Sequence, residues 1–315
     1  MLDRALDEAT RERASASGID WRNAWAGTDS GGTLRAWPEA AAVALDVPQL
    51  VQSLVPSQWL TPSTLLEPMR RDPAHNSEMI SEVLGGERLR ALLRREQWWL
   101  VAGSDGYVGW VHDWVLQDAP SNPTERATFR YGRPHGTLWL SDNRAACPLW
   151  LGMELFAVQG PLGERGGNHL LRTSTGQEGW IPADELMPPG PLPDMRALMN
   201  VLRSLTGIPY RWGGRSPMGF DCSGFVQFAA GLCGVTLERD AAQQAGYGEA
   251  VGLEPDQWRA GDLIFFGQPA DHVAFLDARD GLLHCQGQVR QDRLEGHPLQ
   301  ARISGVRRWW SAPGA

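Results

Sequence analysis

Cys222 stands where a loop rich in glycine changes into an apolar segment with helical spacing. The loop, residues 210–221, reads YRWGGRSPMGFD, and Phe225, Val226 and Phe228 follow at positions that suit the buried face of a helix. Cys222 is therefore expected at a helix N-terminus. Unpaired backbone N–H groups and the helix dipole stabilise a thiolate there. Because a thiolate is a nucleophile, this pattern indicates covalent catalysis by cysteine.

Two downstream histidines are candidates for the base that such a cysteine needs. His272 and His284 each lie in a short apolar run that is typical of a strand, and Asp280-Gly281 between them has the composition of a hairpin turn. Two antiparallel neighbours would present His272 to the cysteine and place His284 behind it. The three residues would then form a triad of nucleophile, base and orienting group.

Several linked motifs surround these residues, and together they resemble the NlpC/P60 cysteine peptidases, which cleave the stem peptide of bacterial peptidoglycan. The motifs are Tyr210-x-Trp212-Gly213-Gly214, Asp221-Cys222-Ser223-Gly224, Arg239-Asp240 upstream of Gln243-Gln244, Ala260-Gly261-Asp262-Leu263 before a strand, and the two histidines. The resemblance covers roughly residues 195–312. For any one residue, a packed thiol or a core histidine would be the simpler interpretation. The ordered set favours catalysis.

The resemblance implies substrate-binding roles for three residues close to the nucleophile. Tyr210 would stabilise the oxyanion or hold substrate; the alternative is a strand aromatic that covers the core. The presence of Asp221 next to the cysteine needs an explanation, because a carboxylate beside a thiolate raises the pKa of the cysteine. In similar family members the matching Asp, together with the residue at Ser223, binds a free α-ammonium group. Asp221 could equally be the N-cap of the following helix, and both roles can hold.

The resemblance also implies an aromatic side chain that closes one side of the substrate cleft from the first SH3-like barrel. Tyr107 is the candidate, whereas Trp110 is expected in the core. One departure from the family pattern follows the Arg-x pair, where Ala241 and Ala242 replace a hydroxyl residue that is often present. A hydrogen bond to substrate is therefore in doubt.

The function implied by the resemblance is that of a cysteine peptidase of the γ-D-glutamyl-L-diamino acid endopeptidase type. It would act as a dipeptidyl-peptidase on peptides that begin L-Ala-γ-D-Glu, with Lys or diaminopimelate at the third position. No cofactor and no metal are expected, since no ligands cluster at short spacing. Two alternatives stay open: an exported endopeptidase that cuts intact peptidoglycan, and a non-catalytic protein that binds wall peptides. The intact Cys222, His272 and His284 count against the second.

Composition and charge limit the partners and the location that can be expected. The chain has 315 residues, 42% hydrophobic residues and a formal net charge of −8, which argues against binding to nucleic acid. No apolar run has the length of a membrane span, so no membrane partner is expected. Residues 1–13 are charged throughout and lack the apolar core of a signal peptide; their spacing indicates a short amphipathic helix. A cytoplasmic location, with access to recycled wall peptides, is the expectation.

The domain organisation is expected to comprise four parts. Residues 1–73 would form an N-terminal helix and an irregular extension, because prolines and tryptophans are scattered through this stretch. Residues 74–118 and 127–188 would form two small SH3-like β-barrels. After a proline-rich spacer at 188–193, residues 194–312 would form the peptidase domain, which opens with a helix capped by Asp194.

An internal repeat supports the pair of barrels. Leu84-Gly85-Gly86-Glu87 matches Leu151-Gly152-Met153-Glu154, and the stretch from Gly109-Trp110 to Leu116 matches the stretch from Gly179-Trp180 to Leu186. Each copy has short β-rich runs separated by turn residues. The predicted fold class is α+β, with a papain-like NlpC/P60 catalytic domain preceded by two SH3-like barrels and the extension.

Overall fold

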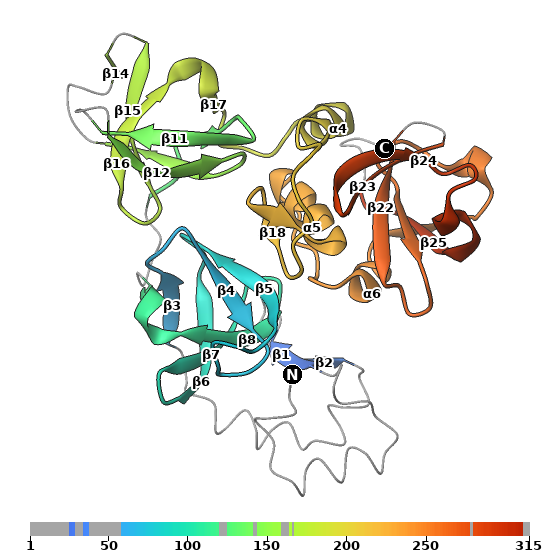
Figure 1. Ribbon diagram of the computed structural model, residues 1–315, viewed down its shortest axis with the longest axis horizontal. Helices are drawn as coiled ribbons and strands as arrows, with labels where there is room; N and C mark the ends of the chain where they lie inside the picture. Colours follow the sequence, from blue (N-terminus) through green and yellow to red (C-terminus); the bar gives the residue numbers. More distant parts are fainter. Residues whose placement is uncertain are drawn as a thin grey trace, which may run out of the picture. The chain divides into compact units, whose positions relative to one another are not determined.

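The computed structural model describes residues 25–28, 34–37, 58–119, 125–140, 144–158, 164–165, 167–277 and 280–310. The chain divides into two units, residues 1–123 and 124–315, and each contains antiparallel β-sheet (Figure 1). The amphipathic helix expected at residues 1–13 lies outside the described residues. None of the described helices is both long enough and apolar enough to cross a lipid bilayer.

The first unit contains an antiparallel sheet and a separate hairpin. The hairpin pairs β1 (Trp25–Thr28) with β2 (Leu34–Trp37). Among the described residues of this unit, seven strands form the sheet in the order β5-β4-β8-β7-β6-β3-β9. They are β3 (Trp59–Pro62), β4 (Leu66–Arg70), β5 (Met79–Leu84), β6 (Leu89–Arg95), β7 (Trp98–Ala102), β8 (Val108–His112) and β9 (Leu116–Asp118). Trp110 is 2% exposed, so the expectation that it belongs to the core is confirmed.

The sheet begins earlier than the sequence predicts. β3 and β4 pair with later strands of the same sheet, yet both lie in residues 1–73, which were expected to form an irregular extension. The boundary at residue 74 is therefore wrong. The reason is that Pro62 and Pro68 lie within these two strands, and proline has no N–H for a ladder hydrogen bond, so it weakens the sequence pattern of a strand.

The second sheet repeats the strand order of the first. In the described part of residues 124–190, eight strands form it, in the order β12-β11-β16-β15-β13-β10-β17, with β14 paired to β15. They are β10 (Phe129–Tyr131), β11 (His135–Trp139), β12 (Ala145–Trp150), β13 (Glu154–Ala157), β14 (Glu164–Arg165), β15 (Asn168–Thr173), β16 (Glu178–Pro182) and β17 (Leu186–Met187). Apart from β14, each strand takes the place of its counterpart in the first sheet. The internal repeat is thereby confirmed.

The repeated glycine has the same packing role in both copies. A β-carbon on Gly109 would collide with the side chain of Met69 on β4, and one on Gly179 would collide with the backbone of Trp139 on β11. The neighbouring Trp110 pairs with β4, and Trp180 pairs with β11. Glycine therefore allows these two strands to approach closely in each sheet.

The rest of the second unit consists of helices packed on another antiparallel sheet. The helices are α4 (Met195–Arg203), α5 (Cys222–Leu232) and the single turn α6 (Ala241–Gln244). The sheet has the order β20-β25-β21-β22-β23-β24. Its strands are β20 (Glu249–Val251), β21 (Leu263–Phe266), β22 (His272–Asp277), β23 (Gly281–Gln286), β24 (Gln288–Arg293) and β25 (Ile303–Arg308). A short hairpin, β18 (Arg215–Ser216) with β19 (Gly219–Phe220), precedes α5. The described fold is mostly β with few helices.

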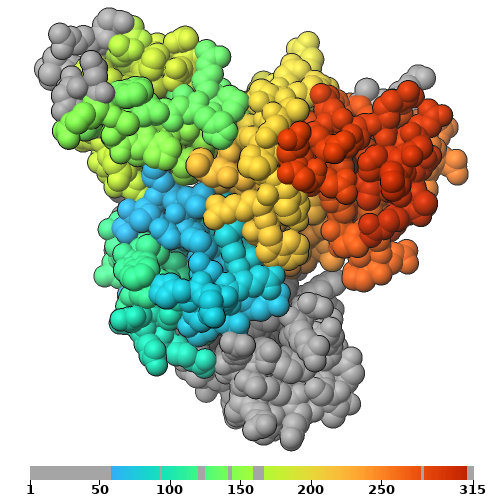
Figure 2. Space-filling view, in the orientation of Figure 1, coloured from blue at the N-terminus to red at the C-terminus, as the bar shows by residue number. Residues whose placement is uncertain are grey.

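Side-chain alternation along β22 gives this sheet two apolar faces. Val273 and Phe275 join the core that α4 and α5 cover, whereas Ala274 and Leu276 join a second core with the 3₁₀ segment at Pro298–Arg302. This is the period of two that a strand buried on both faces requires. On the face shown in the space-filling view, the residues from α4 onward, yellow to red, lie against one another (Figure 2). The expected helix capped by Asp194 is confirmed, since its carboxylate accepts from the Ala197 N–H at 2.7 Å.

Candidate active site

Cys222 is the first residue of α5, as the sequence predicts. The Asp221 carboxylate accepts a hydrogen bond from the Gly224 N–H at 2.7 Å, so the N-cap role of Asp221 is confirmed. Cys222 is 8% exposed, and its Sγ lies 3.9 Å from the carbonyl oxygen of Asp271. Because Asp271 directly precedes His272 at the start of β22, the thiol lies beside the backbone that carries the candidate base.

The thiol form of Cys222 predominates in the free protein. Burial raises the pKa of Cys222 to about 11, and the negative charge of Asp221 adds to this rise. The backbone N–H groups of Val273 and Ser223, with the charge of Arg239, act in the opposite direction and lower the pKa of Cys222. Desolvation therefore outweighs the helix N-terminus, and Cys222 needs a base to release its proton.

The two histidines form a hydrogen-bonded chain that ends on a carboxylate. His272 Nε2 lies 2.7 Å from His284 Nδ1, and His284 Nε2 lies 3.0 Å from Asp292 Oδ2. The expected hairpin of β22 and β23 is confirmed, and it brings the two rings together. His284 is fully buried, whereas His272 is partly exposed.

The chain of contacts assigns a proton to each ring. An ionised carboxylate only accepts hydrogen bonds, so His284 Nε2 must donate to Asp292. A neutral His284 then accepts at Nδ1, and His272 must donate to it from Nε2. The lone pair of neutral His272 is left on Nδ1, which is the nitrogen available to take a proton.

The pKa of His272 favours this neutral form at pH 7. Burial and, to a smaller extent, the neighbouring His284 lower the pKa of His272 to about 4, although the negative charge of Asp271 opposes both. Cys222 and His272 therefore rest as thiol and neutral imidazole. This pair can move one proton when a substrate carbonyl approaches the sulfur.

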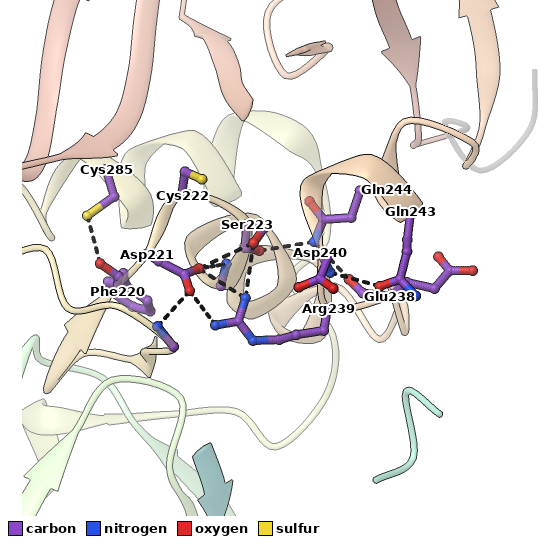
Figure 3. Close-up of polar contacts among 12 residues, drawn as sticks. Phe220, Asp221, Cys222, Ser223, Glu238, Arg239, Asp240, Gln243, Gln244 and Cys285 are labelled. Atoms are coloured by element: carbon purple, nitrogen blue, oxygen red, sulfur yellow. Dashed lines mark hydrogen bonds and ion pairs between the residues drawn. The ribbon is translucent and has the colours of Figure 1, made fainter. Parts of the chain in front are cut away.

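A buried ion pair explains how Asp221 is tolerated beside the cysteine. Arg239 is 1% exposed; its Nη1 donates to Asp221 Oδ1 at 3.0 Å and its Nη2 donates to Oδ2 (Figure 3). The Gly213 N–H also donates to Asp221 Oδ2, at 2.9 Å. Ser223 Oγ accepts from Arg239 Nη1 at 3.0 Å and lies 3.3 Å from Asp221 Oδ1. The guanidinium thus compensates the carboxylate charge that would otherwise oppose a thiolate.

The remaining predicted site residues lie in different surroundings. Tyr210 is near Cys222: burial raises the pKa of Tyr210, and so does the negative charge of Asp221. Tyr107 packs partly buried against the core of the first sheet. Its expected role over the cleft stays a prediction. Cys285, expected to be a packed thiol, is confirmed as one: it is fully buried and donates to the carbonyl oxygen of Phe220 at 3.1 Å (Figure 3).

Sequence reasoning missed two partners of the site, Arg239 as the counter-ion of Asp221 and Asp292 as the acceptor for His284. Arg239 was noted only as part of a motif, and nothing in the sequence says which acid it meets. The side-chain period of β24 was a signal for Asp292, because side chains of residues two apart on a strand point to the same face of the sheet. Among the described residues, no group of three His, Cys, Asp or Glu side chains is placed to hold a metal ion.

Comparison with known protein families finds a match to the part of the chain that carries these residues. Residues 207–308 match the NlpC/P60 family, and residues 69–113 match the bacterial dipeptidyl-peptidase Sh3 domain. The chain contains an NlpC/P60 domain and a bacterial dipeptidyl-peptidase SH3 domain. Cys222, His272 and His284 all lie within the NlpC/P60 domain.

The relatives are similar over most of the chain. It is 25% identical over 291 residues to the gamma-D-glutamyl-L-lysine dipeptidyl-peptidase of Bacillus cereus (strain ATCC 10987 / NRS 248), covering 84% of this chain and 85% of the relative. It is 27% identical over 217 residues to the protein of the same name from Bacillus subtilis (strain 168), covering 65% and 71%. A crystal structure of an NlpC/P60 family protein from Bacillus cereus ATCC 10987 superposes with a TM-score of 0.70 at 18% identity, covering 80% of this chain and 100% of that one. That superposition shows a shared fold.

Proposed function

We propose that this protein is a cysteine peptidase that hydrolyses the γ-D-glutamyl–diamino acid bond of peptidoglycan stem peptides with a free N-terminal L-Ala. The observation that carries the proposal is the buried thiol of Cys222, 3.9 Å from the carbonyl oxygen of Asp271 just before His272, with His272 hydrogen-bonded to His284 at 2.7 Å. The names of the two Bacillus relatives support the substrate class. Release of a dipeptide is the proposed outcome.

The proposed reaction begins with proton transfer from thiol to imidazole. His272 Nδ1 takes the proton of Cys222 Sγ as the sulfur attacks the γ-carbonyl carbon of D-Glu. The developing oxyanion is stabilised by the backbone N–H of Cys222 and by Tyr210, which burial keeps in its hydrogen-donating phenol form. The imidazolium of His272 then protonates the amine of the diamino acid as the C–N bond breaks.

Water completes the proposed cycle. Neutral His272 takes a proton from a water molecule, whose oxygen attacks the thioester carbon. The C–S bond breaks, the sulfur regains the proton from His272, and L-Ala-γ-D-Glu leaves. Throughout, His284 keeps the imidazole of His272 in one orientation through the bond to Nε2.

Recognition of the free N-terminus is proposed to involve Asp221 and Ser223, with Tyr107 closing the cleft. The structure adds a condition to that prediction, since both oxygens of Asp221 already accept from Arg239 and from backbone N–H groups. An α-ammonium group would therefore have to take the place of the weakest contact of this carboxylate, the Ser223 hydroxyl at 3.3 Å.

We further propose that the second sheet is another SH3-like domain and that the catalytic domain is papain-like. The support for the former is the strand order that it shares with the first sheet, of which residues 69–113 match an SH3 domain. A cytoplasmic role in recycling wall peptides is part of the proposal. Fractionation of cells that express the full chain tests that location.

An end-capping experiment tests the proposed function. Purified protein is incubated with L-Ala-γ-D-Glu-L-Lys, with its diaminopimelate counterpart, and with N-acetylated forms of both, and products are identified by mass. Loss of a charged contact costs about 2–5 kcal/mol, so acetylation should lower kcat/KM by roughly two to three powers of ten. A Tyr107→Ala variant should accept the capped peptide better than wild type does.

Other results of this experiment would favour one of the two alternative functions. Equal turnover of free and capped peptides would overturn the dipeptidyl-peptidase proposal in favour of a wall endopeptidase. Binding without any product would favour the non-catalytic alternative.

A further inference from the structure

Asp292 lies at the end of the histidine chain, on the strand next to His284. In the antiparallel pairing of β23 with β24, His284 is opposite Arg290 and Leu282 is opposite Asp292. Arg290 and Asp292 are two residues apart, so they share one face of β24. The Asp292 carboxylate therefore reaches His284 Nε2 across the pair of strands, at 3.0 Å.

Arg290 holds this carboxylate in one orientation. Its Nη2 donates to Asp292 Oδ1 at 2.7 Å, and its Nε lies 2.7 Å from Oδ2. The same Oδ2 accepts the hydrogen bond from His284. A two-point contact of this kind fixes the plane of a carboxylate as well as its position. Asp292 is therefore presented to the ring as an oriented acceptor.

The tautomer of both rings depends on that acceptor. With no acceptor at Nε2, His284 could carry its proton on Nδ1 and donate it to His272 Nε2. His272 would then carry its own proton on Nδ1, the nitrogen that must accept from the thiol. The wrong tautomer disables a catalytic histidine without moving any atom of its ring.

We propose that Asp292 is a positioning residue, which holds His284 and, through it, His272 in the tautomer that leaves His272 Nδ1 free to accept the Cys222 proton. The inference deepens the proposed peptidase function and rests on it for its kinetic consequence. Asp292 acts through His284, and its side chain is not required to touch substrate. Its removal therefore acts on kcat and leaves KM nearly unchanged.

Substitution by asparagine and by alanine should have different effects. In Asp292→Asn, an amide oxygen at the Oδ2 position satisfies His284 and the Arg290 Nε–H and leaves only the Nη2 donor facing an NH₂ group. In the reverse orientation the amide oxygen accepts from Nη2, and the NH₂ group faces the Arg290 Nε–H and donates to His284 Nε2 in the other tautomer. Each orientation leaves one donor of Arg290 unsatisfied, so Asp292→Asn should populate both tautomers and give a kcat between those of wild type and Asp292→Ala. Asp292→Ala should lower kcat by at least about tenfold, below the cost of about 10⁴ for a wrong tautomer in a Ser-His-Asp triad.

Removing Arg290 alone should have a smaller effect than removing Asp292. In Arg290→Met, the Asp292 carboxylate can still only accept from His284 Nε2, so the tautomer is kept. The kcat of this variant should stay well above that of Asp292→Ala. Asp280→Ala is the matched control, because Asp280, in the turn before β23, pairs with the exposed Arg293 at the end of β24 and not with either histidine. This control should stay within about twofold of wild type.

Histidine ¹⁵N NMR gives a readout that does not require turnover. In the wild type, at a pH where both rings are neutral, His272 and His284 should each carry the proton on Nε2; in Asp292→Ala, the Nδ1–H form should appear for both. An Nδ1–H form of His284 in the wild type would overturn the inference. A wild-type kcat in Asp292→Ala would also overturn it. Absence of turnover by the wild type would overturn the proposed function, while the tautomers would still decide the inference about Asp292.

Discussion

Replacement of Arg239 by methionine should destabilise the catalytic domain through the charge it leaves behind. Arg239 is 1% exposed and Asp221 is 9% exposed at the side chain, so the pair lies out of water. The guanidinium also donates to the hydroxyl of Ser223. Arg239→Met removes these donors while keeping the apolar stem, so Asp221 retains its two backbone N–H contacts and loses its counter-ion.

The magnitude follows from the burial of the pair. Breaking a buried ion pair by removing one partner costs about 3–5 kcal/mol, because an uncompensated charge remains. An exposed pair is worth about 0–1 kcal/mol. Arg293→Met is the matched control, since its contact with Asp280 is exposed at 72% and 50% of the two side chains. The variant of the buried pair should thus lose several times more stability than the control.

Urea unfolding followed by fluorescence and circular dichroism measures the difference. A double variant, Asp221→Asn/Arg239→Met, removes both charges and should recover about 2 kcal/mol of the loss, because the unpaired carboxylate is gone. Arg239→Met should also slow alkylation of Cys222, since the positive charge that lowers the pKa of this thiol is removed. The reasoning fails if Arg239→Met loses no more stability than the control, or if the double variant is less stable than the single one.

Three further predictions follow from the site and the fold. Because burial raises the pKa of Cys222 to about 11, its alkylation by iodoacetamide at pH 7, read from the peptide mass, should be about a hundredfold slower than that of a free thiol with a pKa near 9; an equal rate would contradict this. His272→Ala should abolish turnover, whereas His284→Asn should retain part of it; the reverse order would refute the assignment of base and orienting group. Burial raises the pKa of Asp277, but hydrogen bonds from Arg203 and Gln291 outweigh it and lower the pKa; the resulting stability is present above the unfolded pKa and is lost as pH falls through the folded one. The difference in unfolding free energy between wild type and Arg203→Met should therefore become smaller as the pH falls. A difference that does not change with pH would contradict this prediction.

The sequence alone was enough to place Cys222 and the two histidines on their elements. Cys222 begins α5, and His272 and His284 lie on adjacent strands of a hairpin, as the glycine-rich loop, the apolar spacing and Asp280-Gly281 indicate. These signals are local: turn composition and side-chain period are properties of a few consecutive residues. The repeat of two sheets was also readable, because equal spacing of glycine and tryptophan reflects equal strand packing.

The tertiary structure decided which charged groups form pairs and how burial shifts their pKa values. The chain has 37 acidic and 29 basic residues, and no local rule selects Arg239 for Asp221 or Asp292 for His284. The helix N-terminus at Cys222 predicted a thiolate, yet burial raises the pKa of Cys222 to about 11. Ionisation and ion pairing depend on the summed field and desolvation from segments far apart in sequence. Only the folded chain brings those segments within hydrogen-bonding distance, and it excludes the water that would otherwise screen them.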